Sequence, residues 1–162
     1  MNKTVLNKLE KKELIELIMN LSKLNKQNKA FLETQLLLDF NNLFELSCKK
    51  IRKAFCCYEL MGLKDARNAL NDFKKAKPSN ELFIDLCLYY INSAYSLEKT
   101  SWKFQENFYL AIESVFKTII EIIKKNMNLK ENYRVELEKI IKQANEGFGH
   151  QDELKEIYKI IK

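Results

Sequence analysis

Apolar side chains recur at intervals of three and four residues along almost the whole chain, which is the spacing of one face of an α-helix. The stretches 14–24, 104–122 and 133–141 show this pattern most clearly. No sustained alternation of apolar and polar positions, the mark of a half-buried β-strand, interrupts it. The pattern therefore predicts an all-α protein of seven to eight helices.

Short breaks between the amphipathic stretches set the predicted helix ends. One long helix is expected to end at Gly62, because glycine suits the C′ position, and the next helix stops before Pro78. Ser79 then serves as the N-cap of a helix over 81–97, and 147–150 is the clearest loop. Because the breaks are short, successive helices should pack as antiparallel hairpins, in a bundle or a short α-solenoid.

The composition agrees with helices and limits the other classes. The chain has 162 residues, the length of one domain, with only three glycines and one proline. So little glycine and proline argues against a loop-rich sandwich or barrel. We predict a single helical domain over 1–162, in which leader helices over 1–38 can be semi-independent of the rest.

The sequence predicts a cytoplasmic protein without a membrane partner. Residues 1–12 are charged and hold no apolar segment of the kind that a secretory signal needs, and the most apolar stretch, 82–91, is too short to cross a bilayer. The four cysteines are therefore expected to be reduced. No cysteine pair has the spacing of a metal site, and the single histidine lies apart from them, so we expect no metal and no cofactor.

Positive charge is concentrated in one part of the chain. The formal net charge is +6, and residues 47–77 hold nine basic residues against three acidic ones. If the chain turns back at Gly62, the two arms of that hairpin should bring their basic clusters to the same end. The predicted basic patch consists of Lys49, Lys50, Arg52, Lys53, Lys74, Lys75 and Lys77.

This patch has two interpretations. It can bind an acidic protein surface or phosphates, or it can be a solvated face whose lysine stems cover apolar side chains. Arg67 is a separate case, because it lies on a face of small residues where its guanidinium would be partly buried. A buried guanidinium needs an acidic partner, so we expect a structural ion pair with Asp85, with Glu81 as the alternative.

The segment 147–152 is the second candidate site, since it holds two of the three glycines and the only histidine. Phe148 is expected to anchor the loop in the core, and Asp152 to lie in the first turn of the last helix. His150 beside Asp152 is a candidate general base, although a lone histidine at a helix start more often caps or packs.

Two other groups of residues are expected to serve packing alone. Cys56 and Cys57 should pack as small apolar residues. A set of aromatic residues has helical spacing with few lysines near it, which favours core packing over base stacking. This aromatic set is Tyr89, Tyr90, Tyr95, Trp102, Phe104, Phe108 and Tyr109.

Several segments together carry a resemblance to a known family. They are 6–33, 66–75 (ARNALNDFKK), 78, 85–90 (DLCLYY), 108–114, 147–152 (GFGHQD) and 157–158. With them the chain resembles a bacterial family of small all-helical proteins known only as a domain of unknown function. The most specific element is the Gly-x-Gly-x-His-x-Asp-like loop, in which Gln151 here separates His150 from Asp152, two residues expected to be adjacent in relatives. The resemblance implies the all-helical fold and carries no activity.

No motif in the sequence indicates a common enzyme class. The phosphate-binding loop, the dinucleotide-binding glycine pattern, the G-x-S-x-G nucleophile elbow and the H-E-x-x-H zinc motif are all missing. We therefore predict a non-enzymatic helical interaction module that binds another macromolecule, first of all a protein, through the basic hairpin. Nucleic-acid binding through the same patch is the first alternative, and an enzyme that uses His150 and Asp152 is the second.

Overall fold

The computed structural model describes residues 3–37, 39–56, 62–98 and 106–162, and every regular element within these ranges is a helix. The predicted all-α class is confirmed. The α-helices are α1 (Lys3–Leu6), α2 (Lys11–Leu24), α3 (Lys26–Leu37), α4 (Asn41–Cys56), α5 (Leu63–Lys75), α6 (Asn80–Glu98), α7 (Glu106–Lys125), α8 (Lys130–Gln143) and α9 (His150–Lys159). Single 3₁₀ turns, Met127–Leu129 and Gly147–Gly149, precede α8 and α9. None of the helices in these ranges combines the length and the apolar character that a bilayer crossing requires.

The chain divides into two compact units, Met1–Leu46 and Ser47–Lys162, and the division falls within α4. In the first unit α2 and α3 pack against each other as a hairpin. The start of α2 is fixed by a capping box, in which the Glu13 carboxylate accepts the backbone N–H of Glu10 at 2.7 Å. The semi-independence of the leader helices stays a prediction.

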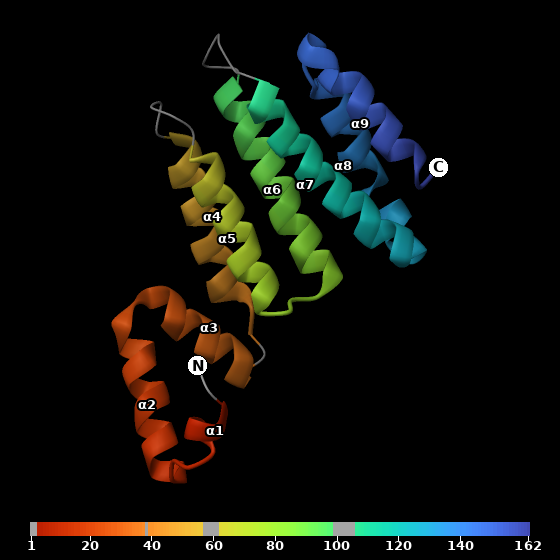
Figure 1. The fold of residues 1–162 in the computed structure, drawn as a ribbon. Coiled ribbons are helices and arrows are strands. Elements are labelled where there is room, and N and C mark those ends of the chain that lie inside the picture. Colours follow the sequence, from red (N-terminus) through yellow and green to blue (C-terminus); the bar gives the residue numbers. More distant parts are fainter. Residues whose placement is uncertain (1–2, 38, 57–61, 99–105) are drawn as a thin grey trace. The chain divides into compact units, whose positions relative to one another are not determined.

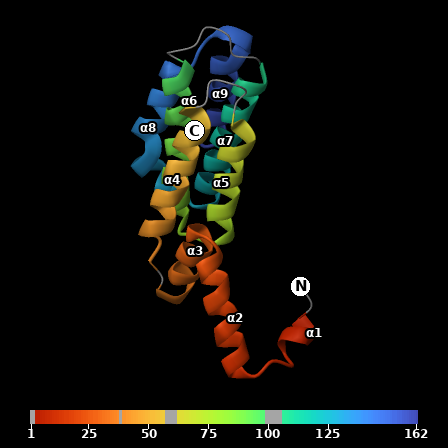
Figure 2. The same cartoon turned by 90° about the vertical axis from the view of Figure 1, so that its left-hand side faces the viewer.

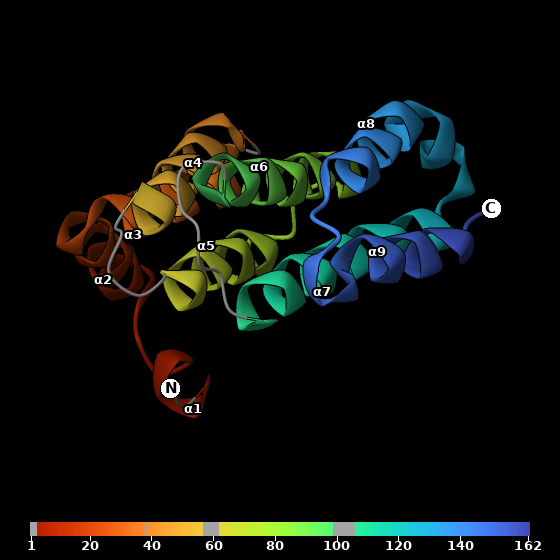
Figure 3. The same cartoon turned by 90° about the horizontal axis from the view of Figure 1, so that it is seen from above.

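The second unit is built from three antiparallel helix pairs, α4–α5, α6–α7 and α8–α9, which follow one another side by side (Figures 1 and 2). Seen from above, α4, α6 and α8 lie in one layer and α5, α7 and α9 in the other (Figure 3). The closest packing joins α6 to α7 and α7 to α9. Helix pairs stacked in this way form a short α-solenoid, one of the two predicted arrangements.

The core of the second unit lies between its two layers. The aromatic rings of Phe73, Tyr90, Phe108 and Phe116 are fully buried there. Burial of each such side chain stabilises the fold by about 1.5–3 kcal/mol relative to leaving it exposed. An edge-to-face contact between Phe55 and Tyr90, with ring centroids 5.1 Å apart, joins α4 to α6 within one layer.

The break between α5 and α6 has the predicted chemistry. α5 ends at Lys75, ahead of Pro78, as expected from the restriction that proline places on the residue before it. The Ser79 hydroxyl accepts the backbone N–H of Leu82 at 3.2 Å. This bond satisfies one of the amides left without a partner at the start of α6, so the N-cap prediction is confirmed.

The prediction for Gly62 is wrong. The described part of α4 ends at Cys56, and Gly62 is the N-cap residue of α5 with φ of −63°, so it does not adopt the left-handed conformation of a C′ glycine. Glycine is required there for a different reason. A methyl group on Gly62 would lie 2.7 Å from the carbonyl oxygen and the Cβ of Ala54, which is closer than these atoms can approach.

Candidate functional site

The solvent-facing side of α4 carries an unpaired group of basic residues. The buried positions of the helix within the second unit are Ser47, Cys48, Ile51, Ala54 and Phe55. With about 100° between successive residues, Lys49, Arg52 and Lys53 fall on the opposite side, and all three are exposed. None of these three forms an ion pair with another described residue. We call these three residues the outer face of α4; Lys50, also exposed, lies beside them.

Arg52 is held in place by the neighbouring helix of the same layer. Its Nε–H donates a hydrogen bond of 3.0 Å to the Tyr89 hydroxyl on α6. This bond favours the charged guanidinium and raises the pKa of Arg52 above its ordinary value. The two terminal Nη groups make no hydrogen bond to another described residue. Arg52 therefore presents an oriented cation with unused donors.

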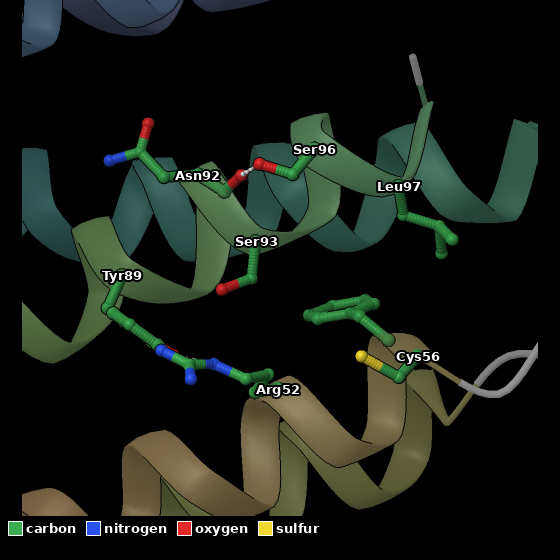
Figure 4. Close-up of a pocket in the computed structure, with 8 residues that line it drawn as sticks. Arg52, Cys56, Tyr89, Asn92, Ser93, Ser96 and Leu97 are labelled. Atoms are coloured by element: carbon green, nitrogen blue, oxygen red, sulfur yellow. Dashed lines mark hydrogen bonds between the residues drawn. The ribbon is translucent and has the colours of Figure 1, made fainter. Parts of the chain in front are cut away.

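A groove opens beside Arg52, between α4 and α6 (Figure 4). Its volume is about 530 Å³. The residues that line this α4–α6 groove are Arg52, Phe55, Cys56, Tyr89, Asn92, Ser93, Ser96 and Leu97. Arg52 and Tyr89 lie at one end, Cys56 and Leu97 lie at the other, and Ser93 lies between them (Figure 4). The groove thus has a cationic end, a hydroxyl-bearing middle and an apolar end, and no carboxylate among its lining residues.

The second predicted basic cluster lies elsewhere on the hairpin. Lys49 and Lys53 lie within about two turns of Cys56, whereas Lys74 and Lys75 end α5 about three turns from Leu63. In an antiparallel pair this separates the two clusters by about 10 Å along the helix axes. The prediction that both clusters meet at one end is therefore wrong, because Gly62 lies against Ala54 and the cluster on α4 is closer to this point than the cluster on α5.

The cluster on α5 is also engaged locally. The Lys74 ammonium lies 5.7 Å from the ring centroid of Phe83 on α6, and Lys75 forms an ion pair of 3.0 Å with Asp72. Lys77 lies in the connection after α5, where it adopts a positive φ of 57°. Of these three lysines, Lys75 alone forms an ion pair with a described carboxylate. The outer face of α4 differs from them because its three cations, none in an ion pair with a described residue, share one side of one helix.

The predicted ion pair between Arg67 and Asp85 does not form. Arg67 donates through an Nη group to the Ser114 hydroxyl on α7 at 2.9 Å. Asp85 instead accepts the Tyr133 hydroxyl of α8 at 3.0 Å. Burial and this bond raise the pKa of Tyr133 above its ordinary value. Arg67 is only half-buried, so it keeps access to water and does not need the carboxylate that full burial would demand.

His150 is the first residue of α9 and is fully buried, with 0% exposure. Its Nδ1 lies 2.7 Å from Oε1 of Glu113 on α7, and its Nε2 lies 3.1 Å from the Tyr95 hydroxyl on α6. Because a carboxylate oxygen accepts, the Nδ1–H of His150 donates to Glu113, and Nε2 forms the hydrogen bond with the Tyr95 hydroxyl. The imidazole thus joins α6, α7 and α9 through polar contacts in the core.

Phe148 and Asp152 line one pocket together with Glu113, the partner of His150, but the buried His150 does not line it. Phe148 is 69% exposed and packs against Tyr109 at a ring distance of 5.7 Å, so the prediction of a core anchor is wrong. The cause is local, because Phe148 has a positive φ of 55° within the turn. Asp152 lies in the first turn of α9 as predicted, but it is exposed and pairs with Lys155. In the part of the chain that the structure describes, no set of three or more His, Cys, Asp or Glu residues is arranged to hold a metal ion.

The packing predictions have mixed outcomes. Tyr90, Tyr95, Phe108 and Tyr109 are buried as expected. Tyr89 is half-buried and lines the α4–α6 groove. Cys56 is exposed instead of packed. Cys57, Trp102 and Phe104 lie outside the described residues.

The sequence analysis did not predict the residues that complete the α4–α6 groove and the hydrogen-bond network of His150. The groove depends on Tyr89, Asn92 and Ser93, which carry no signal in the sequence beyond the side chains themselves. The His150 network depends on Tyr95 and Glu113, which lie 55 and 37 residues from His150 in the sequence, so no local pattern connects them.

Comparisons of the chain with protein-family models, with curated proteins and with solved structures found no match. The family resemblance of the sequence therefore stays a prediction.

Proposed function

We propose that the protein is a non-enzymatic helical interaction module that binds an acidic partner protein through the outer face of α4. The observation that carries this proposal is the group formed by Lys49, Arg52 and Lys53. These three cations are exposed, they share one face, and no described carboxylate neutralises them.

The surrounding architecture supports a protein as the partner. Stacked helix pairs expose long surfaces made by successive helices of one layer, and such proteins use these surfaces to bind other proteins. Arg52 of the outer face of α4 lines the α4–α6 groove, and α4 and α6 lie in the same layer (Figure 3). A groove next to uncompensated positive charge favours association with an acidic surface and speeds the encounter with it.

Charge reversal on two matched faces tests the proposal. One variant carries Lys49→Glu, Arg52→Glu and Lys53→Glu, and the control carries the same reversal at the exposed residues Lys117, Lys124 and Lys125 of α7. Both are used to capture proteins from the native host, with quantitative mass spectrometry. Proteins retained by the wild type and the α7 control but lost by the α4 variant are expected. Equal capture by all three would contradict the proposal.

A gel shift with the same three proteins distinguishes a nucleic-acid partner from a protein partner. Binding driven by phosphates weakens steeply as salt rises, because each contact releases counterions. A gel shift with generic DNA and RNA at low salt is expected to show no complex. Retarded nucleic acid that is lost in the α4 variant would replace the protein partner with a nucleic acid.

A further inference from the structure

The α4–α6 groove has features of a peptide site that go beyond a charged surface. Its cation is fixed in direction, because the Nε–H of Arg52 is already bound to Tyr89. A guanidinium held in this way keeps both Nη groups for a planar, bidentate contact with a carboxylate. The cost of ordering the arginine side chain has thus already been met in the unbound protein.

Other donors of the groove are also unused. The side chains of Asn92 and Ser93 make no hydrogen bond to another described residue, and both line the groove. Ser93 lies between the two ends of the groove (Figure 4). A peptide backbone carries one donor and one acceptor per residue, so these side chains match it in kind.

The dimensions fit a short extended segment. From Tyr89 to Leu97 the helix rises about 12 Å, at about 1.5 Å per residue. An extended chain covers about 13 Å in four residues, and side chains four residues apart point to the same face of it. A side chain at the Arg52 end and another against Leu97 would therefore be about four residues apart in the bound segment.

We propose that the α4–α6 groove binds an extended acidic peptide segment of the partner, with an Asp or Glu carboxylate on Arg52 and a large apolar side chain four residues away against Phe55 and Leu97. This inference rests on the proposed function and specifies the chemistry of the partner. Lys49 and Lys53 flank Arg52 on the same helix face and attract further acidic residues of the segment.

Selection from a library of short random peptides displayed on phage tests the inference directly. The enriched sequences are expected to share an acidic residue four positions from a large apolar one. A labelled synthetic copy of the enriched peptide is then measured by fluorescence anisotropy, beside a copy with glutamine in place of each acidic residue. Equal binding of the two copies, or enrichment without an acidic position, would overturn the inference.

Variants of the groove locate the contact. Arg52→Gln should weaken the acidic peptide roughly 10- to 100-fold, the worth of a hydrogen-bonded charge contact. Tyr89→Phe, which only releases the orientation of Arg52, should weaken it by a few-fold, and Ser93→Phe should block it. The matched control Lys124→Gln should leave it unchanged. Thermal unfolding of each variant confirms that the fold is kept. Unchanged affinity in Arg52→Gln and Ser93→Phe would overturn the inference.

The two proposals fail in different ways. If the charge-reversed α4 variant loses its partner while Arg52→Gln and Ser93→Phe retain it, the groove is not the site but the outer face of α4 is. If the charge-reversed α4 variant keeps its partner, the proposed function itself fails.

Discussion

The contact between His150 and Glu113 should be one of the strongest polar interactions in the fold. The two atoms are 2.7 Å apart, the imidazole is 0% exposed and the carboxylate side chain is 13% exposed. A hydrogen bond to a charged group contributes about 1.5–3 kcal/mol. His150→Ala also leaves a cavity and removes the hydrogen bond between Nε2 and the Tyr95 hydroxyl, so we expect a total loss of about 3–5 kcal/mol.

A double-mutant cycle separates the contact from the cavity. The free energy of unfolding is measured in urea by circular dichroism for the wild type, His150→Ala, Glu113→Ala and the double variant. The expected coupling between the two sites is about 1.5–3 kcal/mol. The exposed pair Asp152–Lys155, treated in the same way, is the control and should couple by less than about 0.5 kcal/mol. Additive losses at His150 and Glu113 would refute the reasoning, because a buried contact of the expected strength must appear as a coupling energy.

Three other predictions concern the core and the cysteines. The Tyr90 hydroxyl is buried without a hydrogen-bond partner among the described residues. Tyr90→Phe should therefore raise the free energy of unfolding in urea by about 1 kcal/mol or leave it unchanged. A decrease of more than about 1 kcal/mol would show that the hydroxyl is bonded. Gly62→Ala should lower stability by about 1–3 kcal/mol in the same assay, since the new methyl group meets Ala54, and an unchanged midpoint would contradict the close approach. Burial raises the pKa of Cys87 to about 12, so its thiol stays protonated at pH 9. Iodoacetamide at this pH should label the exposed Cys56 rapidly and the buried Cys87 only on unfolding. Rapid labelling of Cys87 in peptide mass spectra would contradict its burial.

Local chemistry in the sequence was sufficient to predict several helix ends. Pro78 excludes helix from the residue before it, and Ser79 can cap the next helix with its own hydroxyl. Both effects act within a few residues, so they do not depend on the tertiary fold. The helical period of the apolar residues likewise reports which side of each helix is buried, and this was sufficient for the all-α class.

Features that depend on distant residues could not be predicted. The partner of Arg52 is 37 residues away on another helix, and the Tyr95 hydroxyl is 55 residues from His150. Arg67 was assigned to Asp85 on charge alone, yet a neutral hydroxyl on α7 satisfies it. The packing of the helices selects one of several chemically suitable partners. The spacing of residues along the sequence does not predict this packing.

The backbone of single residues also decided two outcomes. Phe148 was expected in the core because it is a large apolar residue between two glycines, but its own positive φ leaves the ring exposed. The basic clusters were expected at one end because the hairpin was assumed to turn symmetrically about Gly62. Gly62 instead lies against Ala54, so the cluster on α4 lies closer to the turn than the cluster on α5.

Isothermal titration calorimetry of a purified partner at physiological salt is the strongest test of whether the outer face of α4 binds an acidic protein. The partner is taken from the capture experiment and titrated into the wild type, the variant with Lys49, Arg52 and Lys53 reversed, and the α7 control. We expect the α4 variant to bind at least about 100-fold more weakly, and the α7 control to stay within about twofold of the wild type. Equal weakening in both variants would show that only the net charge of the protein matters, and an unchanged constant in the α4 variant would remove this face from the interaction.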